Sequence, residues 1–299
     1  MAEDMRFLPR DALLDLDEIA VIAERFIARG VTKIRLTGGE PLVRRGVTDL
    51  ARRLGQQIGR GLDELTLTTN GTRLAEFAGD LHAAGIRRIN VSLDSLDPDR
   101  FHHITRHGDL SRVLTGIAGA AAAGIAIKIN MVTLKDLNQD EIPAMLAWCV
   151  EQGHDLSLIE TMPLGVIDED RADRFVPLTA VFDDLSRRFD LTRDPRSTGG
   201  PARYWRVGVS PTRLGLISPL TANFCDGCNR VRLTTEGRLY ACLGHDDQVD
   251  LKAALRADGM AGLDAAIDEA LAIKPARHDF QIAPGAAPAV GRHMSVTGG

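Results

Sequence analysis

Residues 64–69 read ELTLTT, in which leucines alternate with polar residues as in a half-buried β-strand. Similar short runs recur along the first half of the chain, at residues 32–37, 88–93, 125–131 and 156–160. Helical patterns separate them, near residues 46–58, 72–84, 111–123 and 138–152. Strand–helix alternation at this spacing indicates βαβ units and a parallel sheet. The sequence therefore predicts an α/β fold, either doubly wound or curled towards a (β/α) barrel.

The expected strands are unusual because one face of most of them is polar, whereas a buried parallel strand is normally apolar on both faces. Helices must cover the apolar faces, so the polar faces should turn to a common interior. Those faces carry Arg35, Thr68, Ser92 and Lys128. A solidly packed barrel would not tolerate so many polar groups, which predicts a sizeable polar ligand inside. The alternative is a hydrogen-bonded polar core, in which Arg35 and Lys128 would need partners.

Beyond residue 161 the alternation stops. The sequence predicts one helix at 178–189, strands at 203–209 and 213–218, and two helices near 249–257 and 261–272. A helix capped by Asp15 and closed by Gly30 should precede the first strand.

Length and composition restrict the classes of protein that the chain can be. With 299 residues and 44% hydrophobic content, it can bury one large domain, or a barrel with an appendage. A net charge of −5 argues against a general nucleic-acid binder. There is no signal peptide and no apolar run of about 18 residues, so we expect a cytoplasmic protein without a membrane partner. Four cysteines in so long a chain are not a disulfide scaffold.

Three of the cysteines form a pattern. Cys225 and Cys228 make a CxxC pair, and a hairpin pattern with a turn at residues 236–237 should bring Cys242 back to them. Three thiolates leave one coordination position open, as on a catalytic metal or an iron–sulfur cluster that binds substrate. A structural zinc site with His245 as fourth ligand, or plain buried thiols, remain as alternatives. The adjacent residues 229–232, NRVR, suit an anionic ligand such as phosphate.

A second motif, TGGEP at residues 37–41, follows the first strand. The active site of an α/β barrel lies at this end of its strands. Its two glycines let the backbone approach a ligand closely. Glu40 can accept a hydrogen bond from an amino group. A plain tight turn between strand and helix is the alternative.

Together with TTNG at 68–71, NVSLDSLD at 90–97 and FCDGCNRVRLT at 224–234, this motif resembles the GTP 3′,8-cyclase family. Members are radical S-adenosylmethionine (SAM) enzymes that open molybdenum cofactor biosynthesis. The resemblance runs through the whole chain. It implies an incomplete (β/α) barrel of the radical SAM type, with its first strand missing here, and a C-terminal cluster-binding extension. The expected division is residues 1–165 for the SAM- and GTP-binding core and 166–299 for the cluster region with its Gly-Gly tail.

The resemblance also implies roles for individual residues. SAM would be bound by Gly39, Ser92 and Met162. GTP would be bound by Arg35, Thr68, Lys128, Arg230, Val231 and Arg232. An auxiliary [4Fe–4S] cluster would be held by Cys225, Cys228 and Cys242. The final residues, Gly298 and Gly299, match a family tail that reaches the active site. The resemblance assigns no residue as a general acid or base.

The implied reaction converts GTP to (8S)-3′,8-cyclo-7,8-dihydroguanosine 5′-triphosphate. The implied partners are an electron donor protein, the downstream cyclic pyranopterin monophosphate synthase and a second copy in a homodimer.

One departure from the family concerns its second [4Fe–4S] cluster, which cleaves SAM. The CxxxCxxC motif that holds that cluster does not occur in this sequence, which begins at Met1-Ala2-Glu3-Asp4. The expectation is a truncated sequence or a misassigned start, with a genuinely shortened relative as the alternative. The chain alone is then expected to be inactive.

Two alternative functions remain. The first is a catalytically inactive nucleotide-binding barrel with one cluster or a zinc ion. The second is another radical SAM enzyme with an auxiliary cluster, but the NRVR run and the Gly-Gly tail argue against it.

Overall fold

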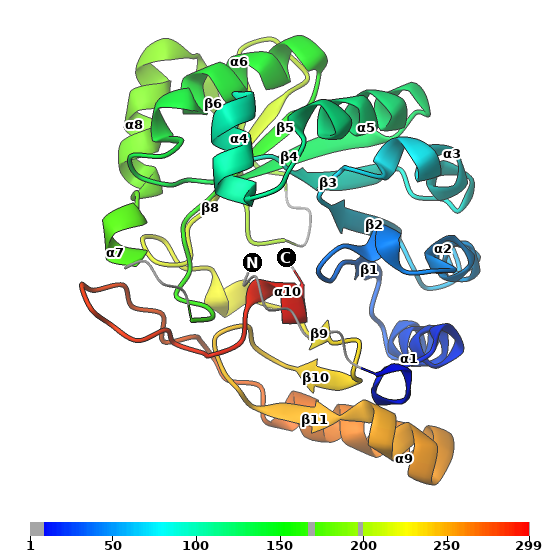
Figure 1. The fold of residues 1–299 in the computed structure, drawn as a ribbon. Coiled ribbons are helices and arrows are strands. Elements are labelled where there is room, and N and C mark those ends of the chain that lie inside the picture. Colours follow the sequence, from blue (N-terminus) through cyan, green and yellow to red (C-terminus); the bar gives the residue numbers. More distant parts are fainter. Residues whose placement is uncertain (1–8, 167–170, 197–199, 299) are drawn as a thin grey trace.

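A computed structural model of the chain describes residues 9–166, 171–196 and 200–298 (Figure 1). The first eight residues and Gly299, the last residue of the expected tail, lie outside these ranges. An eight-stranded sheet has the order β1-β2-β3-β4-β5-β8-β7-β6, and a three-stranded sheet has the order β11-β10-β9. None of the helices in the described ranges has the length and apolar character that a bilayer crossing requires.

The first five strands of the large sheet are parallel and lie where the alternating runs predict them. They are β1 (Lys33–Leu36), β2 (Glu64–Thr69), β3 (Arg88–Ser92), β4 (Ala126–Val132) and β5 (Asp155–Ile159). Their apolar side chains, such as Leu65, Leu67 and Ile89, are fully buried against the helices. The prediction of an α/β fold with a parallel sheet is confirmed.

Helices connect these strands and cover one side of the sheet (Figure 1). They are α1 (Leu16–Ala28), α2 (Val47–Gly55), α3 (Leu74–Ala83), α4 (Pro98–Thr105), α5 (Leu110–Ala122) and α6 (Ile142–Gln152). Asp15 and Glu18 form a reciprocal capping box at the start of α1. The helical patterns did not predict α4, although Asp97 caps it and Pro98 occupies its first turn.

The large sheet continues beyond residue 165. Strand β8 (Arg213–Ile217) is parallel to β5, and β7 (Arg203–Val207) and β6 (Leu191–Asp194) add to it antiparallel. Helices α7 (Arg171–Arg174) and α8 (Leu178–Arg188) precede β6. Within the described ranges no pairing joins the two edge strands, β1 and β6, so the barrel is incomplete. The short strand β6 was not predicted.

The small sheet faces the open side of the large one (Figure 1). It contains β9 (Arg232–Leu233), β10 (Arg238–Tyr240) and β11 (Gln248–Asp250), followed by α9 (Leu251–Ala272) and, near the end of the chain, α10 (Met294–Thr297). The hairpin between β9 and β10 is the predicted one, and Gly237 takes a positive φ of 83° in its turn. The two helices expected near 249–257 and 261–272 both lie within α9, and Gly259, with a non-helical φ of 59° and ψ of −139°, separates them.

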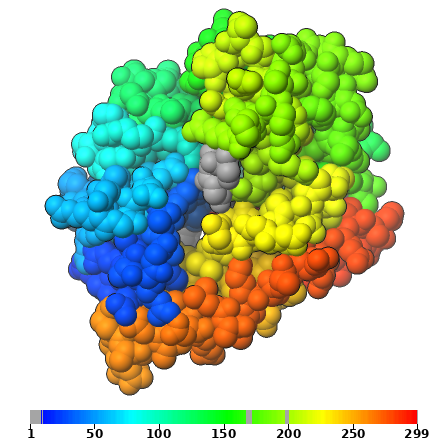
Figure 2. Space-filling view, turned by 180° about the vertical axis from the view of Figure 1, so that it is seen from behind, coloured from blue at the N-terminus to red at the C-terminus, as the bar shows by residue number. Residues whose placement is uncertain are grey.

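A second apolar cluster joins the small sheet to the N-terminal segment. Leu14 and Ile22 are buried with Leu251, Leu263 and other residues of α9 and the hairpin. Arg25 pairs with Asp264 across the same contact. In the view from behind, helix α9 (orange) runs along the blue N-terminal segment, and the surface is hollowed between the blue and yellow parts of the chain (Figure 2).

Candidate active site

The inner face of the large sheet starts with an ion cluster at the N-terminal ends of its first three strands. Glu64 accepts from the Lys33 ammonium at 2.6 Å and from the Arg88 guanidinium at 2.6 Å. Burial by itself raises the pKa of the Glu64 carboxyl, but these two cations outweigh it and the pKa is lowered. The cluster keeps one carboxylate ionised and neutralises part of the charge of two cations.

One layer further along the strands lie the residues expected to contact GTP. Thr68 and Lys128 are buried, and Arg35 is exposed to the interior space. The amide of Asn90 donates to Thr68 Oγ1 at 3.5 Å, and Lys128 Nζ donates to the Tyr204 hydroxyl at 2.6 Å. The alternation on the strands therefore identified the inner face correctly.

The interior is positively charged. Loss of solvation, and then the neighbouring charge of Arg88, lowers the pKa of Arg35. Burial likewise lowers the pKa of Lys128. Neither Arg35 nor Lys128 is bonded to a carboxylate within the described ranges, whereas Lys33 and Arg88 share Glu64. This arrangement leaves uncompensated positive charge where an anionic ligand can bind.

Arg232, on β9, and Arg230, two residues before that strand, face this layer from the side of the small sheet. Burial lowers the pKa of Arg232 to about 10, with further contributions from the charges of Arg230 and Arg35. Arg35 in turn is affected by Arg230, so the cations of the two sheets are close enough to interact. The Val231 side chain, in contrast, packs against the second apolar cluster. The structure thus brings the predicted cations together and turns the valine side chain into the core.

The loop after β1 is held by its own glutamate. Glu40 accepts from Leu42 N–H at 3.0 Å, from Thr69 Oγ1 at 2.8 Å and from Asn70 N–H at 2.7 Å. Both oxygens are engaged with the chain, so the observed role of Glu40 is to tie two loops together rather than to await a ligand amino group. At Gly39 an added Cβ would meet nothing within 4 Å, so the backbone faces open space.

The other two residues expected at SAM lie at the same edge of the sheet. Ser92 ends β3 with an exposed side chain, and Met162 is half-buried just after β5. Next to Ser92, burial raises the pKa of the Asp94 carboxyl to about 6, although it accepts from Val132 N–H at 2.8 Å. The carboxyl ends of parallel strands are where ligands of α/β folds bind.

The three cysteines of the pattern are half-buried free thiols on the hairpin and the turn before it. Whether these three thiols form the ligand set of a cluster stays a prediction. Within the described ranges, no three His, Cys, Asp or Glu residues are arranged to hold a metal ion. The ammonium of Lys274 lies close to these thiols, 4.0 Å from Cys228 Sγ and 2.6 Å from the carbonyl oxygen of Ala241, next to Cys242.

The zinc alternative is not supported, because no group of three such ligands is found in the described ranges and His245 Nε2 lies 3.1 Å from the Arg277 carbonyl oxygen. The donor set does suit an iron–sulfur cluster, which is larger than one ion and is held by thiolates. Burial raises the pKa of the Cys228 thiol, but hydrogen bonds from the Arg230 backbone and guanidinium, with the charge of Lys274, outweigh it and lower the pKa.

The C-terminal tail enters the same space. Arg232 donates to the carbonyl oxygens of Thr297 and Gly298. Gly298 has φ of 77°, and a Cβ on it would lie 2.2 Å from the Thr37 side chain of the TGGEP motif. Arg292 anchors the tail to the carbonyl oxygens of Cys242, Leu243 and His245. As far as Gly298, the tail therefore lies beside Arg232 and the TGGEP motif.

Sequence reasoning missed Tyr204, Lys274 and Arg292. Each contacts the site through a residue distant in the sequence, and the pattern around each resembles ordinary strand or loop. For Tyr204, the one signal in the sequence was that tyrosine is rare in this chain, which has two.

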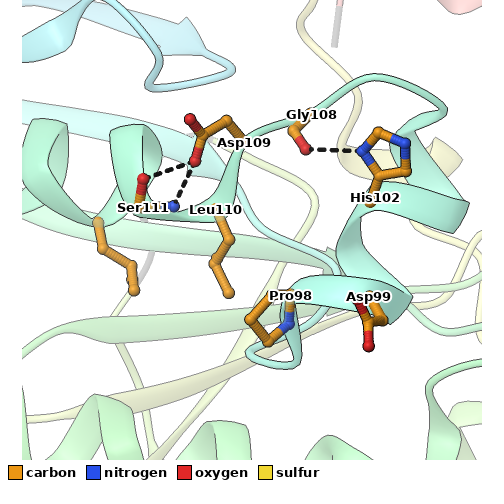
Figure 3. Close-up of a pocket in the computed structure, with 8 residues that line it drawn as sticks. Pro98, Asp99, His102, Gly108, Asp109, Leu110 and Ser111 are labelled. Atoms are coloured by element: carbon orange, nitrogen blue, oxygen red, sulfur yellow. Dashed lines mark hydrogen bonds between the residues drawn. The ribbon is translucent and has the colours of Figure 1, made fainter.

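A hollow of about 450 Å³ lies elsewhere, between α4 and α5 (Figure 3). Its lining includes His102, whose Nδ1 lies 3.4 Å from Gly108 O, and Asp109, which caps α5. These groups already serve the chain, and none of the expected site residues lines the hollow.

Comparisons with known proteins agree with this architecture. The Radical SAM superfamily matches residues 2–149, and the Molybdenum Cofactor Synthesis C family matches residues 154–280. Streptococcus suis SuiB bound to S-adenosylmethionine has a similar fold, with a TM-score of 0.57 at 13% identity. That match covers 83% of this chain and 58% of SuiB, and it bears on the fold alone. The fold and the family matches define a radical SAM protein, a class that uses SAM and [4Fe–4S] clusters.

Similar proteins of known name identify the family within the radical SAM class. The GTP 3′,8-cyclase of Erythrobacter litoralis is 56% identical over 300 residues, covering 100% of this chain and 90% of the relative. Those of Rhizobium etli and Rhodopseudomonas palustris are each 57% identical, covering 100% of this chain and 86% and 88% of the relative. The chain belongs to the GTP 3′,8-cyclase family.

Proposed function

We propose that the chain acts as a GTP 3′,8-cyclase, which converts GTP to (8S)-3′,8-cyclo-7,8-dihydroguanosine 5′-triphosphate at the start of molybdenum cofactor biosynthesis. The observation that carries the proposal is the interior layer of cations, in which Arg35 and Lys128 face Arg230 and Arg232. A triphosphate carries several negative charges, and charge-assisted hydrogen bonds to it are strongest where water is excluded.

In this proposal each residue binds or orients. Arg35, Lys128, Arg230 and Arg232 hold the phosphates, and the Thr68 hydroxyl adds a neutral hydrogen bond. The part of Val231 that contacts GTP is its backbone, because its side chain packs into the second apolar cluster. Gly39 offers open backbone, Ser92 a hydroxyl and Met162 a polarisable surface to SAM.

The cofactors that the proposal requires are SAM and [4Fe–4S] clusters. Cys225, Cys228 and Cys242 would hold the auxiliary cluster, with Lys274 moving aside from the sulfurs. When bound, SAM and the clusters supply the one-electron chemistry, and the protein supplies binding and orientation. The CxxxCxxC ligands of a second cluster are not among the four cysteines of this sequence.

The proposal extends to organisation and partners. Residues 1–165 form the SAM- and GTP-binding core and residues 166–299 the cluster region, with β6, β7 and β8 of the latter completing the large sheet. The partners are an electron donor protein, the downstream cyclic pyranopterin monophosphate synthase and a second copy of the chain, in the cytoplasm.

The test is GTP binding by the anaerobically reconstituted protein. The double variant Arg230→Ala/Arg232→Ala should lose about 100-fold or more in GTP affinity, because two charge-assisted hydrogen bonds to phosphate are removed. Equilibrium dialysis with labelled GTP measures this. Arg187→Ala, which removes an exposed arginine paired with Asp184, is the control and should bind GTP normally. Unchanged affinity in the double variant would remove the phosphate role of the two arginines.

A further inference from the structure

The contact of Lys128 with Tyr204 reaches over two intervening strands of the large sheet. Lys128 lies on β4 and Tyr204 on β7, with β5 and β8 between them. The ammonium donates to the phenol oxygen at 2.6 Å and also lies 4.9 Å from the centroid of the ring. Both side chains are buried, with 6% and 2% of their surfaces exposed. The phenol thus fixes the position of the ammonium in two ways.

The intervening strands leave room for this contact. Gly215 of β8 pairs with Tyr204 on one side and with Ser157 on the other. A Cβ on Gly215 would lie 2.9 Å from Tyr204 Cε1 and 2.8 Å from Ser157 Oγ. Any larger residue would push the ring away from β4. A glycine and a serine are therefore what allow the tyrosine to reach across the inner face.

The chemistry of the partner distinguishes Lys128 from the neighbouring cations. Lys33 and Arg88 share the carboxylate of Glu64, which offsets their charge. The partner that holds Lys128 is a phenol oxygen rather than a carboxylate. An ammonium also has three N–H donors, and the phenol accepts one of them. Within the described ranges, Tyr204 is the hydrogen-bond partner of Lys128.

We propose that Tyr204 is a positioning residue for substrate, which holds the Lys128 side-chain nitrogen in the orientation that binds a phosphate group of the nucleotide. This inference rests on the proposed function, because it presupposes that Lys128 contacts GTP. It adds a residue that the family resemblance did not assign. It also predicts that loss of one phenolic oxygen should act on phosphate binding alone.

The experiment compares Tyr204→Phe, Lys128→Gln and the double variant in the reconstituted full chain, with GTP and guanosine as ligands. Tyr204→Phe keeps the ring and removes only the acceptor. It should weaken GTP binding about tenfold, because the hydrogen bond that orients a charged group is removed, and leave guanosine binding unchanged. In the double variant the two effects should not add, since both act through the same ammonium.

The control is Thr212→Val, which removes another buried hydroxyl beside the same sheet. Thr212 Oγ1 donates to the Cys149 carbonyl oxygen, behind the sheet and away from the interior. This variant should bind GTP and guanosine normally. If the loss of any buried hydroxyl beside the sheet weakened GTP binding, Thr212→Val would show that loss too. An equal loss of GTP affinity in Thr212→Val and Tyr204→Phe would therefore overturn the inference.

The outcomes separate the inference from the proposed function. Normal GTP affinity in Tyr204→Phe, with a loss in Lys128→Gln, overturns the role of Tyr204 and leaves the proposed function standing. Normal affinity in Lys128→Gln removes the assignment of Lys128 and the inference with it. Fully additive losses also count against the inference.

A second measurement serves if Tyr204→Phe does not fold. The chain contains two tyrosines, Tyr204 and Tyr240, so 3-fluorotyrosine labelling gives two ¹⁹F resonances, and Tyr240→Phe assigns them. GTP should shift the Tyr204 resonance and guanosine should leave it in place. Equal shifts with both ligands would contradict a role in phosphate binding.

Discussion

At the scale of single residues, two acids close to the site differ in what they do: Glu160 fixes loops, and Asp94 responds to pH. Glu160 is fully buried and accepts from the backbone N–H groups of Leu178, Leu220 and Thr221. It therefore fixes the segment that leads to Cys225. Asp94 accepts one backbone hydrogen bond, which does not offset its burial, and its pKa is raised to about 6.

The raised pKa makes Asp94 a source of pH dependence. Its pKa in the folded protein lies above the ordinary value of 3.8, so the folded protein binds the proton more tightly than the unfolded one. Stability from this group is present at low pH and is lost as pH rises through the interval between the two values. Between pH 5 and pH 7, Asp94→Asn should gain about 1 kcal/mol relative to the parent protein, measured by urea unfolding. A difference that stays constant across this interval would contradict the prediction.

Residue-level contacts were the least predictable feature. Alternation on single strands was enough to place Arg35, Thr68 and Lys128 on the inner face, since the side chains of a strand alternate between its faces. It could not identify their partners. Lys128 meets Tyr204, and Lys274 reaches Cys228 and Ala241, because of register and loop path, which no local pattern records.

At the scale of elements, the hairpin of β9 and β10 positions the candidate site residues that come from the C-terminal part of the chain. It places Arg232 at the interior and leads directly to Cys242. The sequence predicted this hairpin from Gly237 and its flanking alternation, and it predicted the five parallel strands for a similar reason. It missed β6 and β11, which have four and three residues and too little sequence to show a period.

The thiols of the hairpin give a prediction about iron. The reconstituted parent protein should carry about four irons per chain at these thiols, and Cys242→Ser should lose them, because a cluster of this type depends on its thiolate ligands. Iron and sulfide analysis, with the visible absorption of the cluster, measures this. Cys149→Ala, which removes the buried thiol of α6, is the matched control and should keep its iron.

Zinc in place of iron, or iron retained by Cys242→Ser, would show that these thiols are not the ligands of a cluster. Lys274→Ala adds information, because the ammonium lies beside Cys228. If it only fills the space between the ligand segments, this variant should take up iron as well as the parent protein does.

At the scale of the whole molecule, the site lies between two sheets that different parts of the chain supply. Helices α1 and α9 hold the sheets in place through the second apolar cluster and through the pair of Arg25 with Asp264. The tail closes the space from a third direction, with Gly298 against Thr37 and Arg232 on its carbonyl oxygens. The fold class followed from strand–helix alternation, but the closure of the site depends on contacts between residues more than 200 positions apart, such as Arg25 and Asp264.

The central claim is that the interior between the sheets binds a nucleotide mainly through its phosphates. The most direct measurement is the affinity of the anaerobically reconstituted protein for GTP, GDP and guanosine at one salt concentration. We predict that affinity falls at each removal of phosphate, by about tenfold or more for each charge-assisted hydrogen bond that the smaller ligand can no longer make. Guanosine that binds as tightly as GTP would contradict the account.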